Sequence, residues 1–139
     1  MTDATFEKVG LSEKRLYGDR KLLLCGFPAT AQVKFKTLLG MIGISALPLV
    51  WVGLQDVRET VGGLIARPDG SGEGTGSELP RAIIVAGLAE NELHTLMSGC
   101  RQAGMQQALW AVLTPTSESW PLGQLLNELA AERAAMSKG

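Results

Sequence analysis

The chain has 139 residues, and its 13 lysines and arginines nearly balance its 14 aspartates and glutamates, for a net charge of −1. Hydrophobic residues make up 45% of it, which is enough for the core of one ordinary domain and excludes a wholly disordered chain. A protein held to nucleic acid through its phosphates is usually clearly basic, so the charge balance argues against a nucleic-acid partner.

The first 20 residues are polar and mixed in charge, and we expect them to form an N-terminal arm before a single domain at residues 21–139. Residues 1–10 contain no apolar run of the kind found in secretory signals, so a cytoplasmic protein of bacterial type is the default expectation. The uncharged stretch 37–55 approaches the length of a membrane span, but three glycines and a proline interrupt it. We therefore predict no membrane partner.

The first half predicts two strands and two helices. Residues 22–25 form a compact apolar run that ends at a glycine, which is typical of a buried strand. Residues 31–42 repeat apolar side chains on one helical face and end before Gly43, where a helix-terminating glycine belongs. A strand at 47–52 and a short helix at 57–66 are expected to follow.

A loop is expected between the halves. Residues 67–80 read RPDGSGEGTGSELP, a composition that indicates a flexible Gly-rich loop. Such a run does not by itself indicate phosphate binding, because the segment lacks both the GxGxxG spacing and the Gly-Lys-Ser/Thr ending of a P-loop.

The second half repeats the order of the first. An apolar run at residues 83–86 predicts a strand, and residues 93–100 have helical spacing and are followed by Gly104. Residues 109–113 predict another strand. A final amphipathic helix is expected from residue 122 to at least residue 130, with Pro121 at a favourable first-turn position.

Aligning each residue with the one 61 positions later reveals an internal repeat. Repeats 21–67 and 82–128 place three glycines of the first over three of the second, and their apolar residues keep the same register. The matched glycine pairs are Gly26 with Gly87, Gly43 with Gly104, and Gly62 with Gly123.

Two units of strand, helix, strand and short helix predict an α+β fold. The expected architecture is an α/β two-layer sandwich of tandem βαβ(α) repeats with ferredoxin-like pseudo-twofold symmetry. A mainly parallel four-stranded sheet is the alternative, because βαβ crossovers normally join parallel strands.

A motif near the C-terminus supports a family resemblance. The strand at residues 83–87, the Glu-rich helix start and the sequence TPTSESW at 114–120 resemble an uncharacterised bacterial domain-of-unknown-function family with a TPTN-x-x-W motif. The resemblance spans residues 81–136, with Ser117 where the family tends to have Asn and Leu88 where Phe is common. It implies no established activity.

The loop at residues 114–120 is the best candidate for a ligand-binding site. It joins a buried strand to a helix start, where anionic ligands often bind. Thr114, Thr116 and Ser117 supply hydroxyl groups, and Trp120 supplies a stacking face. The structural alternative is that the hydroxyls cap the last helix and the tryptophan packs into the core.

Other candidate residues have simpler interpretations. Gly87 could bring a backbone amide to a ligand, or it could satisfy a tight turn. His94 is the only histidine, and no metal-ligand spacing surrounds it, so we expect a surface residue. Cys25 and Cys100 are expected to be small buried thiols. We predict no catalytic residue, no metal and no cofactor.

Two functions remain open from these observations. The favoured one is a small non-catalytic binding or protein-interaction module, for which a homodimer is one expected arrangement. The alternative is a regulatory domain that senses a small anionic ligand or nucleotide at residues 114–120. An enzyme is disfavoured, because no nucleophile and base are evidently paired.

Overall fold

The computed structural model describes residues 14–44, 46–105 and 107–138, and all eight predicted elements are present in it. They are β1 (Lys21–Cys25), α2 (Ala29–Met41), β2 (Leu49–Val52), α3 (Val61–Ile65), β3 (Ala82–Ala86), α4 (Glu90–Gln102), β4 (Leu109–Val112) and α5 (Leu122–Lys138). Short 3-10 turns, η1 (Leu54–Asp56) and η2 (Ser117–Ser119), precede α3 and α5. The helix predicted at 57–66 is therefore shorter than expected.

The strands form one mixed sheet in the order β2-β1-β3-β4. Within each βαβ unit the two strands are parallel neighbours, and the units meet through the antiparallel pair β1–β3. The expected ferredoxin-like arrangement is wrong, because it needs split βαβ units whose strands are not neighbours. The mainly parallel sheet, which was the alternative, is the one observed.

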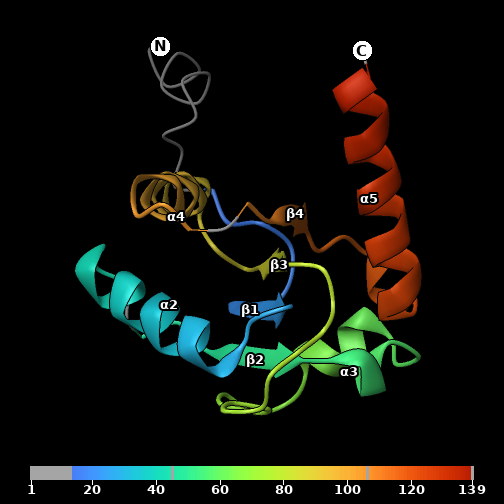
Figure 1. The fold of residues 1–139 in the computed structure, drawn as a ribbon, viewed down its shortest axis with the longest axis horizontal. Coiled ribbons are helices and arrows are strands. Elements are labelled where there is room, and N and C mark those ends of the chain that lie inside the picture. Colours follow the sequence, from blue (N-terminus) through green and yellow to red (C-terminus); the bar gives the residue numbers. More distant parts are fainter. Residues whose placement is uncertain (1–13, 45, 106, 139) are drawn as a thin grey trace.

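The expected two-layer sandwich is also wrong, because helices cover both faces of the sheet (Figure 1). On one face, Leu22 and Leu24 pack with residues of α2 and α4. On the other, Leu23 and Cys25 pack with residues of α3 and α5. All five residues of β3 are buried, as expected for a strand covered on both faces.

The offset of 61 residues runs through the whole architecture. The first unit, β1 to α3, and the second unit, β3 to α5, have matching pairings: Leu22 faces Leu49, and Ile83 faces Trp110. Helices α2 and α4 both have 13 residues and begin at equivalent positions. Whether the units arose by duplication stays a prediction.

The two units also contact each other symmetrically beside α3 and α5. The Val61 amide donates to the Trp120 carbonyl at 2.9 Å, and the Leu122 amide donates to the Glu59 carbonyl at 2.9 Å. These two bonds are equivalent under the offset, and they flank a bridge between Thr60 and Pro121. Backbone hydrogen bonds to the other unit therefore hold the starts of α3 and α5.

The segment before β1 is anchored along the turn that follows β3. Most of the predicted N-terminal arm lies outside the described residues, but residues 14–20 run along 87–90, where the Leu16 amide donates to the Leu88 carbonyl. The predicted flexible loop at 67–80 lies along the outer edge of β2.

No helix in the described ranges is long and apolar enough to cross a membrane.

Candidate functional site

The polar side chains of the 114–120 loop bond mainly to one another. The Ser117 hydroxyl accepts from the Thr114 amide at 3.0 Å, and the Thr114 hydroxyl accepts from the Ser117 amide at 2.9 Å. These reciprocal bonds close the turn η2 rather than capping α5. Ligand binding by Thr114 and Ser117 stays a prediction, and their amides already have partners.

The equivalent turn of the first unit solves the same problem with a carboxylate. A carboxylate oxygen of Asp56 accepts from the Gly53 amide at 3.0 Å, three residues earlier, as Ser117 does for Thr114. Asp56 also accepts from Arg67 at 2.9 Å. Both turns thus need a side-chain oxygen that accepts from the backbone amide three residues earlier. The first unit supplies a carboxylate oxygen, and the second supplies a hydroxyl oxygen.

The remaining residues of the loop have different surroundings. Thr116 is exposed, and its carbonyl accepts from both the amide and the hydroxyl of Ser119. Trp120 is half-buried and packs against the core under α3 and α5. Glu118 accepts a hydrogen bond of 2.6 Å from the Tyr17 hydroxyl. The structure therefore gathers the predicted residues in one turn, with Trp120 used in packing.

Gly87 is enclosed by backbone rather than open to a ligand. It has a φ of +71°, and a Cβ atom there would lie 2.4 Å from the Arg20 nitrogen. Its amide donates to the Tyr17 carbonyl at 3.0 Å. Gly26 has the same conformation against residues 79–81. Both glycines let the segment preceding one strand pass beside the turn that follows the other.

The other singled-out side chains fit their simple interpretations. His94 is exposed, and both cysteines are free and buried, as predicted. Burial raises the pKa of Cys25 to about 12 and that of Cys100 to about 11, so neither thiol is activated for nucleophilic chemistry. Within the described ranges, no three His, Cys, Asp or Glu residues gather where they could hold a metal ion.

Sequence reasoning missed the outer edge of β4. The Leu109 amide donates to the carbonyl of Arg81, just before β3, and the Leu113 amide donates to the carbonyl of Val85 in β3. The amides of Trp110 and Val112, which alternate with them, therefore point away from the sheet. In the described part of the chain, no hydrogen bond reaches those two amides from the outer side. Three of the four residues of β4 are only half-buried, whereas all four of β2 are buried.

The corresponding edge of β2 is covered by the loop that follows the first unit. The Trp51 amide donates to the Ser71 carbonyl at 2.8 Å, and the Gly70 amide donates to the Leu49 carbonyl at 2.7 Å. Gly72 lies so close that a Cβ atom would be 2.1 Å from the Trp51 carbonyl oxygen. The glycine-rich composition of the loop thus allows it to cover an edge strand.

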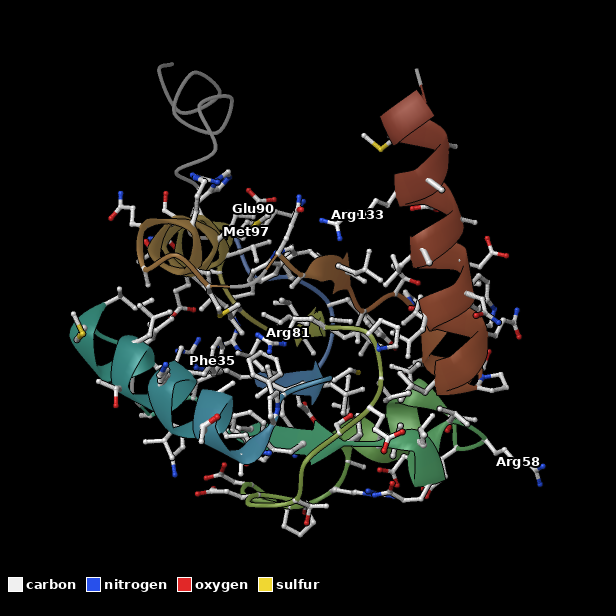
Figure 2. The ribbon with its side chains drawn as sticks, in the orientation of Figure 1. Phe35, Arg58, Arg81, Glu90, Met97 and Arg133 are labelled. Carbon is white, nitrogen blue, oxygen red and sulfur yellow. The ribbon has the colours of Figure 1, made fainter. Side chains whose placement is uncertain are left out.

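Surface hollows flank the open edge of β4. One is lined by Met97, Met105 and Trp110, and another by Trp110, Leu129 and Met136. Arg133 borders both of them and points from α5 towards α4 in Figure 2. The open backbone therefore lies between apolar side chains from α4 and α5.

Comparison with known proteins covers only the second unit. Residues 81–136 match the family model of a domain of unknown function, DUF3783. This match confirms the coarser expectation of a domain of unknown function over these residues, which are fewer than half of the chain, whereas the TPTN-x-x-W motif stays a prediction. No curated protein and no solved structure matches the chain.

Proposed function

We propose that this protein is a small non-catalytic protein-interaction module that associates with a second copy of itself through β4. The observation that carries the proposal is the unequal treatment of the two sheet edges: the 67–80 loop covers β2, whereas none of the residues that the structure describes covers the outer edge of β4 with backbone hydrogen bonds. An unpaired edge strand is a template for another strand, and most proteins protect such edges.

The length of α5 favours a second copy as the occupant. Its buried residues, Leu122, Leu125 and Leu126, all lie in its first half. Beyond half-buried Leu129 the helix continues past β4 (Figure 1), and Met136 is 81% exposed. A second copy joined edge to edge would place its own sheet under this overhanging half.

The covered β2 edge explains why association would stop at two copies. A sheet with two open edges adds strands without end, whereas a sheet with one open edge closes in an antiparallel pair related by a twofold axis. Glu132 and Arg133 provide both signs of charge beside the open edge. Two copies can therefore meet there without facing only like charges.

Two substitutions test this association without disturbing the separate chain. Val112→Pro removes an amide that points outward, where proline is tolerated on an edge strand, and Met136→Glu adds a charge to an exposed position. Met41→Glu is the matched control, because Met41 is 78% exposed at the end of α2.

Sedimentation velocity from low micromolar to millimolar concentration provides the measurement. We expect a dimer for the original chain and for Met41→Glu, and a monomer for Val112→Pro and Met136→Glu. An original chain that stays monomeric throughout, or a dimer unaffected by both edge substitutions, overturns the proposal.

The alternative function, sensing of a small anion or nucleotide at residues 114–120, has less support. The Thr114 and Ser117 hydroxyls and amides that would contact such a ligand are bonded within the turn. Ligand binding there would first have to break those bonds.

A further inference from the structure

Arg81 is a buried cation with no carboxylate partner among the described residues. The residue immediately precedes β3 and is 9% exposed. Its Nε donates to the Gly26 carbonyl at 2.9 Å, and its guanidinium carbon lies 4.3 Å from the centre of the Phe27 ring. In the described part of the chain, no acidic side chain forms a salt bridge with it.

The equivalent arginine in the other half does have a partner. Arg20 immediately precedes β1, and Arg81 immediately precedes β3. The Arg20 amide packs against Gly87, and the Arg81 amide packs against the equivalent glycine, Gly26. Arg20 forms a two-pronged ion pair with Glu92 in the first turn of α4, with 2.6 Å between its second nitrogen and the second carboxylate oxygen.

The residue equivalent to Glu92 in the first unit is Ala31, in the first turn of α2. A cavity of about 260 Å³ lies beside this position and is lined by Ala31, Arg81, Lys34, Phe35, Leu38 and Met105, among others. Figure 2 shows Arg81 beside Phe35, between α2 and α4. The cavity therefore contains a guanidinium group at the place where its internal partner is absent.

We propose that this cavity binds a small carboxylate with an apolar tail, whose carboxylate takes the place at Arg81 that the Glu92 carboxylate takes at Arg20. The planar guanidinium group suits two-pronged carboxylate recognition. Lys34 adds a second positive charge at the cavity, and Phe35, Leu38 and Met105 provide apolar contact for the tail. This cavity shares Met105 with one of the hollows beside β4, but none of its named lining residues belongs to β4 itself.

The surroundings of Arg81 compensate only part of the cost of burying its positive charge. Burial lowers the pKa of Arg81, and among the described residues no neighbouring charge opposes that effect. The Phe27 ring and the carboxyl end of α4 beside the cavity offset part of the cost of burying the cation. A bound carboxylate would offset more of it.

Titration of the full chain with sodium butyrate, followed by amide NMR shifts, tests the site. We expect saturable shifts at residues 31, 81 and 104, little response to sodium chloride at equal ionic strength, and none to butyramide, which has the same shape without the charge. Inorganic phosphate that binds more tightly than butyrate, or shifts that never saturate, would overturn the assignment.

Substitution at the vacant position sharpens the test. Ala31→Glu supplies an internal carboxylate, so we expect it to raise the melting temperature and to weaken butyrate binding by about tenfold or more. Thr30→Glu is the control, because it adds the same charge to the same helical turn at an exposed position. Equal butyrate affinity in Ala31→Glu and the original chain contradicts the proposal.

The second unit offers the reverse experiment. Glu92→Ala should create at Arg20 the vacancy that exists at Arg81, so acetate should raise the melting temperature of this variant more than sodium chloride does. A variant that acetate fails to stabilise would show that an arginine at this position does not recruit an external carboxylate, and would count against the site at Arg81.

Discussion

At the end of their second strands, the two halves of this molecule solve one problem with different side chains. The first unit closes its turn with Asp56, which is bonded to Arg67, and the second closes the equivalent turn with Ser117. In both turns a side-chain oxygen accepts from the backbone amide three residues earlier, although the 3-10 turns begin at different positions and the accepting oxygen is a carboxylate in one turn and a hydroxyl in the other. The fold requires an accepting side-chain oxygen at this position in both halves, whereas the ion pair with Arg67 belongs to the first half.

The same contrast appears at the arginines that precede the central strands. Arg20 is paired with Glu92, whereas no acidic residue is found among the described residues that line the cavity beside Arg81. It appears again at the sheet edges, where β2 is covered and β4 is open. In the first unit the edge strand is covered and position 31 supplies no acid to Arg81, whereas in the second unit Glu92 pairs with Arg20 and the described residues leave the edge strand open.

The largest expected effect concerns the shared backbone. Gly87→Ala forces a side chain into a left-handed conformation and against the Arg20 backbone, so we expect a loss of about 3 kcal/mol or more of unfolding free energy. Gly104→Ala has a similar φ of +72° but open space around it, so it should lose only about 1 kcal/mol. Urea denaturation measures both, and equal losses would contradict the role of close approach.

A smaller effect separates the two turns. Asp56→Ala removes the acceptor of the Gly53 amide and one ion-pair partner of Arg67, and we expect a loss of about 2–3 kcal/mol. Ser117→Ala removes only the turn-closing acceptor and should lose about 1 kcal/mol. Asp56→Ser keeps an acceptor and should fall between them. If Asp56→Ala and Ser117→Ala lose the same amount, the ion pair contributes nothing.

The smallest effect is a dependence on pH. The Arg20 hydrogen bond holds the pKa of Glu92 below its usual value of 4.5, so its stabilising effect is complete above that value and is lost as the pH falls through the lowered pKa. We expect Glu92→Gln to lose about 1 kcal/mol at neutral pH, and this difference to shrink in acid.

Urea titrations between about pH 3 and pH 7 measure this difference. Ala31→Gln serves as the first-unit counterpart, because that position carries no ionisable group in the original chain. Its stability relative to the original chain should change little over the same range. A difference for Glu92→Gln that persists undiminished at the acid end would show that the ion pair does not depend on the ionised carboxylate.

Much of the secondary structure could be predicted because it depends on local patterns. The helix at α2 followed from apolar spacing and from Gly43, and the strand at β3 from a short apolar run that ends at Gly87. The offset of 61 residues also predicted which helices and strands of the two units are equivalent. The ferredoxin-like order was wrong because strand adjacency depends on where each crossover places its strand, which periodicity does not encode.

The candidate site was harder to predict. The loop at 114–120 was correctly placed between β4 and α5, but its hydroxyls bond within the turn. The open edge of β4 and the cavity at Arg81 were missed, although the sequence contains a signal for the cavity. Extending the offset by one residue before the repeat aligns Arg20 with Arg81, and the same offset puts Ala31 opposite Glu92.

The sequence by itself determined the kinds of elements, their order and the positions where glycine is needed, because these depend on residues near one another in the chain. It also held the clue to three layers, since strands that are apolar at every position need cover on both faces. Only the tertiary structure decided which strands are neighbours, which edge is covered and which arginine has a partner. Those outcomes depend on contacts between residues far apart in the chain, such as Ser71 with Trp51 and Glu92 with Arg20.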